Sequence, residues 1–483
     1  MMYTDDEDLY LSRINAAYTG CILSCNPYIK EYKDFFPFHD SSLSEFILAV
    51  PGIVFNIPVT VLKVIYEFLL PFLLSLLIYW LIFRLTKNTW FSILGSIFII
   101  LGFNLINSVD LINILDIFHL FRLENNHTQF LIFSRPVNPQ FSSIFFFIYL
   151  HVLFSAVTKK TYNWFILLAL TYGFSFYIYF FTYTFITIIQ GVWVVICLLK
   201  REWKTFNCFC ITTVVGLAIA TPHLIEIFRL FQHPYYSTIP TGFLISTHIP
   251  DISLLGVMLF LIFIVIIILY IKRFKIITMS AYFIGSLILA CFITRNEHII
   301  SGMIMQYDHF ENYLFSPILV IALCFCLHAF INNIHQKRFY WLIALVSFVP
   351  IINACIIQYD FYHFWLYRAI NDQKYVPVLE WLKAKIPANV VVYAPESLSA
   401  LIPIYTHDYV IWSAHAYQWV SVPGRMQDIL SSRTSASKFE ESTKKYGVDY
   451  YIEEKKKDLF LRDKVKKERI YEDEDFVVYK ASQ

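Results

Sequence analysis

The stretch VIYEFLLPFLLSLLIYWLIF, residues 64–83, decides the fold class of this chain, because Glu67 is its only charged residue. An α-helix needs about 20 apolar residues to cross the hydrocarbon core of a bilayer. A second stretch, ISLLGVMLFLIFIVIIILYI at 252–271, carries no charge. The 483 residues are 58% apolar and 15% charged, whereas soluble domains are roughly 25% charged. The sequence therefore predicts an integral membrane protein.

Apolar runs of similar length recur along the chain, and we expect about ten of them to span the membrane as helices. These runs are 62–84, 90–107, 141–158, 163–181, 183–199, 205–222, 252–271, 276–294, 314–334 and 339–357. The alternate connectors RLTKN, KKTYN, KREWK, KRFK and HQKR hold twelve Lys and Arg residues against one acid, Glu202. The positive-inside rule places these connectors in the cytoplasm. The longer loops, which usually carry function, are then extracytoplasmic.

The chain is predicted to have three parts: an external acidic segment (1–61), a helical membrane domain (62–357) and a soluble α/β domain (372–483). This orientation requires the first segment to cross the membrane with no span before it. We therefore expect a first helix to precede Asp5, and a naturally translocated N-terminal tail is the alternative.

The soluble domain is predicted from alternating helix and strand patterns. Helices are expected in VPVLEWLKAKIP and SKFEESTKKYG, strands in NVVVYAP, DYVIWSA and VDYYIEE, and an edge hairpin in KERIYEDE and DFVVYK. Such alternation favours a small α/β layer structure with a largely parallel sheet.

Composition also excludes some functions. A net charge of +2 without a basic stripe argues against a nucleic-acid partner. Most of the nine cysteines fall inside apolar runs, where Cys acts as a small hydrophobe, and they show no metal-binding spacing. Cys21 and Cys25 lie four residues apart in a polar segment, and spacing alone does not establish whether they pair.

The acidic opening TDDEDLYLSRI, residues 4–14, is the most distinctive polar stretch. Asp6, Tyr10 and Arg13 have helical spacing, so a helix would align a carboxylate, a phenol and a guanidinium that could meet a charged ligand. The alternative is that the acids only start a surface helix, where the helix dipole favours them.

The pattern Asp6-Glu7-x-x-Tyr10 resembles the signature in the first external loop of GT-C glycosyltransferases, which include protein O-mannosyltransferases and lipid A aminoarabinose transferases. The segments GCILSCNPYIKEYKDFFPFHDSSLSEFILAVPG and FSRPVNPQFSSIFFF also resemble uncharacterised bacterial members. The resemblance implies a multi-pass protein of the bacterial cytoplasmic membrane. It also implies a sugar donor on a polyprenyl phosphate, used on the extracytoplasmic side, and an external acidic residue at the catalytic centre.

Transfer of a sugar from such a donor requires deprotonation of an acceptor hydroxyl or activation of an acceptor amide, and a carboxylate can do either. Asp6 is the predicted base, with Glu7 second. Either carboxylate, Asp6 first, could instead hold Mg²⁺ or Mn²⁺. Asp40 and Glu45 could orient the acceptor, and Glu45 could equally be the first-turn acid of a helix capped by Ser42 or Ser44.

The leaving phosphate calls for a cation at the outer face. Arg135 is the candidate, because a guanidinium binds phosphate oxygens in pairs, and Asn138 lies in the same irregular loop. Alternatively, Arg135 could anchor the end of a membrane span at the membrane–water interface. His309 and Tyr235 are further candidates for donor or acceptor contacts, and His309 could equally be a hydrogen-bonded interface residue.

Two other function classes stay open. A transporter or lipid flippase would bury ionisable groups near the middle of the bilayer, where the predicted spans hold few. A non-catalytic scaffold would have no need for Asp6. Thr406, His407 and Asp408 are attributed to a turn between two strands. The preferred prediction is a glycosyltransferase with a lipid-linked sugar donor and a glycan, lipid or protein acceptor, embedded among membrane lipids.

Overall fold

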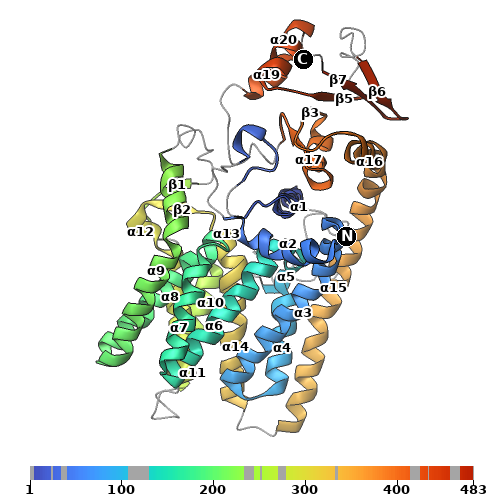
Figure 1. Cartoon of the computed structure of the whole chain (residues 1–483). Coiled ribbons are helices and arrows are strands. Elements are labelled where there is room, and N and C mark those ends of the chain that lie inside the picture. The colour runs from blue at the N-terminus through green and yellow to red at the C-terminus, as the bar shows by residue number, and fades with distance from the viewer. Residues whose placement is uncertain are drawn as a thin grey trace.

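The computed structural model is a bundle of apolar helices with a small sheet domain at one end (Figure 1). The described residues are 5–22, 25–33, 41–106, 130–232, 244–250, 253–269, 279–331, 336–413, 425–432, 435–456 and 468–481. Asp40 and Tyr235, two of the predicted site residues, lie outside these ranges.

Seven helical segments in the described part of the chain are long and apolar enough to cross a membrane. They are Val59–Thr86, Pro136–Lys159, Phe180–Leu199, Trp203–Arg229, Met279–Ser301, Tyr307–Ile331 and Trp341–Lys385. The helices within or around them are α3 (Val59–Thr86), α6 (Ser142–Lys159), α8 (Phe180–Leu199), α9 (Trp203–Phe231), α11 (Met279–Arg295), α14 (Ser316–Ile331) and α15 (Gln336–Asp372). A polytopic helical membrane protein is therefore confirmed.

The predicted number of about ten spans is not confirmed. A helix coincides with each predicted span, but three of these helices are short: α4 (Thr89–Leu101), α7 (Tyr162–Ser175) and α10 (Leu254–Leu269). At about 1.5 Å per residue such helices are shorter than a hydrocarbon core of about 30 Å. Apolar length in the sequence overstated their helical length because each run includes residues that leave the helix.

Short elements connect the long helices. They are α5 (Phe103–Ile106), η4 (Ile132–Ser134), η5 (Pro136–Phe141), β1 (Leu244–Ser246), α12 (His298–Ser301), β2 (Met303–Met305), α13 (Tyr307–Phe310) and η9 (Glu311–Phe315). Strands β1 and β2 pair antiparallel. The bundle interior is rich in aromatic side chains, and Gly216 of α9 allows close approach to Tyr172 of α7, because an added Cβ would lie 2.2 Å from that ring.

The C-terminal domain follows the 37-residue helix α15. Its helices and strands are η10 (Gln373–Tyr375), α16 (Val376–Lys385), β3 (Val391–Tyr393), α17 (Glu396–Tyr405), β4 (Tyr409–Val410), α19 (Arg425–Ser432), α20 (Ala436–Lys445), β5 (Tyr450–Glu454), β6 (Glu468–Glu472) and β7 (Phe476–Lys480). These elements confirm the predicted helices, strands and edge hairpin.

The sheet order is β4-β3-β5-β7-β6. β3 is parallel to β4 and β5, whereas β7 is antiparallel to β5 and β6. The expected largely parallel sheet is thus wrong, because the closing hairpin contributes half of the strand pairings among the described residues. The stretch at Thr406–Asp408 is also different from the prediction, since it joins α17 to β4 rather than two strands.

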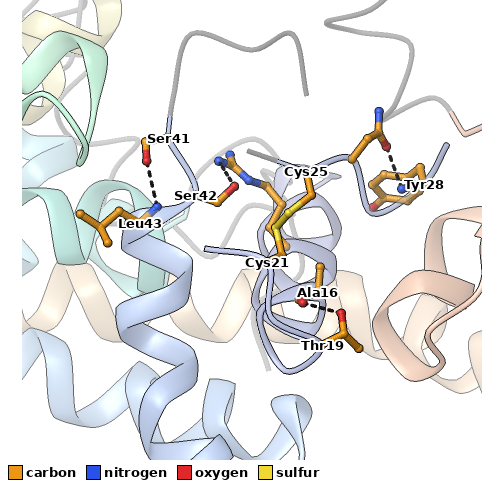
Figure 2. The surroundings of a disulfide bond; sticks show 10 residues. Ala16, Thr19, Cys21, Cys25, Tyr28, Ser41, Ser42 and Leu43 are labelled. Carbon is orange, nitrogen blue, oxygen red and sulfur yellow. Dashed lines mark hydrogen bonds between the residues drawn. A yellow bond between two sulfur atoms is a disulfide. The ribbon is translucent and has the colours of Figure 1, made fainter. Parts of the chain in front are cut away.

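The N-terminal segment belongs to the core of this C-terminal domain. Leu9, Tyr28 and Ile29 pack into the same buried cluster as Val392 and Ile452 of the sheet. The Val410 N–H donates a hydrogen bond of 2.7 Å to the Tyr28 carbonyl, so the N-terminal segment extends the hydrogen bonding beyond β4. Cys21 and Cys25 form a disulfide after α1 (Figure 2).

Candidate functional site

Helix α1 (Asp5–Ala17) lies between the membrane helices and the C-terminal domain (Figure 1). It packs on α2 (Leu43–Phe55) and α3 on one side and on α17 on the other. Leu11 and Ile14 share a buried cluster with Leu62 and Tyr66 of α3. The acidic opening is therefore a buried helix at the junction of two domains, and not the surface helix of the alternative interpretation.

Glu7 faces two cations from different parts of the chain. Its Oε2 lies 2.9 Å from Nζ of Lys63 on α3, and its Oε1 lies 3.7 Å from Nε of Arg135, which immediately precedes η5. The side chains of Glu7 and Lys63 are 4% and 2% exposed. Glu67, one turn along α3, lies 3.9 Å from the same Lys63 ammonium. Two acids and two cations thus form one buried charged cluster.

Tyr10 extends this cluster along α1. The Asn138 amide Nδ2 donates a hydrogen bond of 3.1 Å to the Tyr10 hydroxyl, and the Arg135 guanidinium lies 5.9 Å from the Tyr10 ring centroid. Asn138 is 5% exposed. The two residues predicted from the loop 133–141 therefore meet the acidic opening at consecutive positions on one face of α1.

Arg13 makes the third contact on this face. Its Nη1 lies 3.0 Å from Oε1 of Glu45, and its Nη2 donates to the Ser42 hydroxyl at 3.1 Å. Both charged side chains are almost completely buried, at 1% and 2% exposure. Glu45 lies in the first turn of α2, as the alternative to acceptor binding predicted. Neither Ser42 nor Ser44 makes the side-chain cap that this alternative included. Glu45 instead balances Arg13.

The structure thus brings together six predicted residues: Glu7, Tyr10, Arg13, Glu45, Arg135 and Asn138. For Asp6 it describes the backbone position in α1, in helical register with Tyr10 and Arg13, and not the side chain. Lys63 was missed. The signal for it is a lone cation at the start of an apolar span, one turn before Glu67.

His309 lies in a separate aromatic cluster. Its ring stacks on Phe181 at 4.5 Å between centroids, and its Nδ1 lies 2.5 Å from the Tyr179 hydroxyl. The neighbouring Ile178 carbonyl accepts a hydrogen bond from Ser44 of α2. His309 therefore belongs to the layer that supports α2, which matches its interpretation as a hydrogen-bonded interface residue.

An apolar cavity of about 430 Å³ lies beside α10 and α11. Val257, Leu259, Phe260 and Phe292 are among its lining residues, and Arg295 lies with Asn296 at the end of α11. Arg295 forms an ion pair of 2.9 Å with Glu311. The lining is thus largely apolar and includes an arginine whose charge is balanced by Glu311.

The described side chains do not form a metal site. They include no cluster of three or more His, Cys, Asp and Glu residues. Glu7 also faces Lys63 and Arg135, which would repel a divalent cation. Metal binding by Asp6 stays a prediction.

A second polar region lies where α17 meets β4. Burial raises the pKa of the Asp408 carboxyl to about 6. Burial, together with Lys383, lowers the pKa of His407. The Asn15 amide of α1 donates hydrogen bonds of 2.9 and 2.6 Å to the carbonyls of Pro403 and Thr406. This connection ties the acidic helix to the C-terminal domain.

Comparisons with known proteins identify the fold. No protein-family model matches the chain, and neither does any curated protein sequence. Among solved structures, apo ArnT from Cupriavidus metallidurans matches with a TM-score of 0.54 at 11% identity, over 99% of this chain and 94% of that one. ArnT bound to undecaprenyl phosphate matches with a TM-score of 0.51 at 12% identity, over the same shares of both chains.

The oligosaccharyltransferase of Archaeoglobus fulgidus, in complex with Zn and sulfate, matches with a TM-score of 0.51 at 11% identity. The match covers 94% of this chain and 64% of the archaeal protein, so this chain spans less than two thirds of that protein's length. At these identities the likeness concerns the fold. The chain has the fold seen in ArnT and in the archaeal oligosaccharyltransferase.

Proposed function

We propose that this protein is a GT-C type glycosyltransferase that moves a sugar from a polyprenyl-phosphate donor to a cell-surface acceptor on the extracytoplasmic side of the membrane. The observation that carries this proposal is the buried charged cluster of Glu7, Lys63 and Arg135 beneath the acidic helix. A scaffold has no evident use for so many buried charges, because each is costly to remove from water. The ArnT structure with undecaprenyl phosphate supports the donor class.

In the proposed reaction, the acceptor hydroxyl oxygen attacks the anomeric carbon and the bond from that carbon to the phosphate oxygen breaks. Asp6 takes the hydroxyl proton as the general base. Polyprenyl phosphate leaves, and Arg135 and Lys63 offset the negative charge on its oxygens. Glu7 acts as a positioning residue, because its two carboxylate oxygens lie against these two cations.

The apolar cavity beside α10 and α11, whose lining includes Arg295, is proposed to accept part of the polyprenyl chain. Its lining is apolar, and it lies between helices that contact the bundle core. The disulfide between Cys21 and Cys25 supports the extracytoplasmic assignment of α1, because disulfides persist in oxidising compartments.

The test uses purified protein in lipid nanodiscs with radiolabelled polyprenyl-phosphate sugars and a cell-envelope extract as acceptor. Release of polyprenyl phosphate is measured for the parent protein and for Asp6→Asn and Arg135→Gln. Removal of a general base is expected to slow turnover by about 10²–10⁴-fold. The matched control for Arg135→Gln is Arg469→Gln, since Arg469 is 60% exposed on β6 and pairs only with Glu472 among the described residues.

Turnover that is lost in Asp6→Asn and kept in Arg469→Gln supports the proposal. Equal turnover in Asp6→Asn and the parent rules out Asp6 as the base. A parent protein that binds the labelled lipid without releasing polyprenyl phosphate points instead to the transporter or scaffold interpretation. Unchanged thermal unfolding of each variant excludes misfolding as the cause of a loss.

A further inference from the structure

A polar cavity of about 590 Å³ opens where α1, the disulfide loop, the end of α9 and the α17–β4 connection meet. Its volume lies within the roughly 300–1,000 Å³ typical of small-molecule sites. It does not include the Glu7 cluster, although both touch α1. Ser12, which lines the cavity, lies five residues after Glu7, or about 7.5 Å along a helix axis.

The lining is dominated by uncharged hydrogen-bonding side chains. These lining residues include Ser12, Asn15, Asn26, Asn389, Thr406 and His407. Charges of both signs are among the lining residues: Lys33 is positive, and Glu226 and Asp408 are acidic. A site with many amide and hydroxyl groups, and without a dominant charge, suits a neutral molecule that carries many hydroxyls. The half-buried Tyr409 adds an aromatic surface to the same wall.

Asn26 is a buried polar side chain among the residues that line the cavity. It is 1% exposed, and its Oδ1 accepts hydrogen bonds from the N–H groups of Tyr28 and Ile29 at 2.8 and 2.9 Å. Its Nδ2 has no hydrogen-bond partner among the described residues. A buried amide donor without a partner costs about 1–3 kcal/mol, and this cost arises at the wall of the cavity.

The walls of the cavity are held in place from several sides. Asn15 donates to the carbonyls of Pro403 and Thr406, and its Nδ2 lies 3.5 Å from Nδ1 of His407. The disulfide joins two lining residues, Cys21 and Cys25 (Figure 2). The cavity therefore does not depend on a ligand to form, and preorganisation of this kind reduces the entropy lost on binding.

We propose that this cavity binds the carbohydrate portion of the acceptor, which makes the acceptor of this protein a glycan. The assignment of the bound carbohydrate as the acceptor depends on the function proposed above, whereas carbohydrate binding itself does not. An anionic lipid headgroup fits less well, because the lining contains two acids, Glu226 and Asp408, beside one lysine, Lys33. A lipid chain is excluded by the polarity of the walls.

Binding is tested directly, without turnover, on the full chain in nanodiscs. The probe is an array of neutral di- to hexasaccharides of glucose, galactose, mannose and N-acetylglucosamine, with phosphatidylglycerol vesicles and a random decapeptide library as competing classes. The first variant is Asn26→Asp, which keeps an oxygen for both accepted hydrogen bonds and replaces the amide donor with a carboxylate oxygen, adding a negative charge at the cavity wall. The second is His407→Ala, at an exposed side chain.

Asn88→Asp is the matched control. Asn88 Oδ1 also accepts two backbone N–H groups, those of Trp90 and Phe91, but at the start of α4 and away from the cavity. We expect saturable binding of one or more array saccharides, weakened at least tenfold in Asn26→Asp and His407→Ala and unchanged in Asn88→Asp.

Three results would overturn the inference: no saccharide retained by the parent, retention unaffected by both cavity variants, or selective retention of peptide or phosphatidylglycerol. Saccharide binding that follows the expected pattern, in a protein that releases no polyprenyl phosphate, would support the carbohydrate site while contradicting the glycosyltransferase proposal. Release of polyprenyl phosphate without saccharide binding would leave the glycosyltransferase and remove the glycan acceptor.

Discussion

Glu7 and Lys63 form a buried ion pair, 2.9 Å between Oε2 and Nζ, that joins α1 to α3. We expect Lys63→Met to destabilise the protein by about 3–5 kcal/mol, because it leaves Glu7 as a buried charge with less compensation. The double variant Glu7→Gln/Lys63→Met is expected to recover part of that loss, since no charge of the pair then remains, while Arg135 and Glu67 each lose one charged neighbour. The measurement is reversible unfolding in mixed micelles. Additive losses in the double variant would show that the two side chains do not interact.

Arg13 tests whether geometry or charge matters at the contact with α2. Arg13→Lys keeps the charge but cannot reach both Glu45 and Ser42 with one planar fork. The expected destabilisation is about 1–2 kcal/mol, equivalent to one or two lost hydrogen bonds. The same exchange at the exposed Arg469 is the control, with an expected change below about 0.5 kcal/mol. Equal effects at the two positions would contradict the described contacts.

Asp408 predicts a pH dependence of stability. Burial raises the pKa of its carboxyl from 3.8 to about 6 in the folded protein. A raised carboxyl pKa stabilises the fold below pH 3.8, and this contribution is lost as the pH rises through 6. Asp408→Asn, which cannot ionise, should therefore gain stability relative to the parent protein between pH 4 and pH 7, by roughly 1–3 kcal/mol.

The measurement for Asp408 is thermal unfolding of both proteins from pH 4 to pH 7.5. Asp428→Asn is a useful comparison, because Lys445 and Tyr446 hold the pKa of the Asp428 carboxyl below its ordinary value. Between pH 4 and pH 7.5 its stability difference from the parent should stay nearly constant, because a carboxyl with a lowered pKa is already ionised throughout this range in both the folded and the unfolded protein. A difference between Asp408→Asn and the parent that does not vary with pH would refute the assignment.

The disulfide predicts the side of the membrane on which α1 lies. In intact cells, a membrane-impermeant maleimide is expected to label Cys21 and Cys25 only after an impermeant reductant has been added. The Cys21→Ser/Cys25→Ser variant should lose this reductant-dependent labelling. Labelling that requires permeabilised cells would place α1 in the cytoplasm and invalidate the extracytoplasmic reaction.

Closing this short loop is expected to stabilise the protein by about 2 kcal/mol through the entropy of the unfolded chain. The parent protein should therefore unfold at a lower temperature in reductant, whereas the double serine variant should be insensitive to it. Reductant that lowers both unfolding temperatures equally would act elsewhere in the chain.

Local patterns in the sequence were sufficient to predict the long helices and several residues of the charged cluster. Tyr10 and Arg13 follow Asp6 at helical spacing, and Arg135 precedes the irregular η5 segment, so their polarity was visible in the sequence. Lys63 was not recognised, because one cation at the start of a span commonly has an interfacial role. Its function here depends on Glu7, which lies 56 positions earlier and gives no periodic signal.

The parts that sequence reasoning missed depend on contacts between distant segments. Asn26 and Tyr28 lie in a segment with little regular structure, yet Tyr28 packs in the core of the C-terminal domain. The polar cavity exists only because that segment meets residues 403–409. The number of spans stays unconfirmed for another reason: hydropathy measures the apolar length of a run and not where its helix ends.

The bond from Asn15 to the Thr406 carbonyl joins positions 391 residues apart. At a synthesis rate of about 5–20 residues per second, roughly 20–80 s pass between the synthesis of Asn15 on α1 and that of Thr406. Throughout that interval the membrane helices can already be inserted, while α1 still lacks its contacts with α17. The packing of α1 against the C-terminal domain is therefore among the last parts of the protein to be completed, and a nascent chain stalled before Thr406 would be inserted without it.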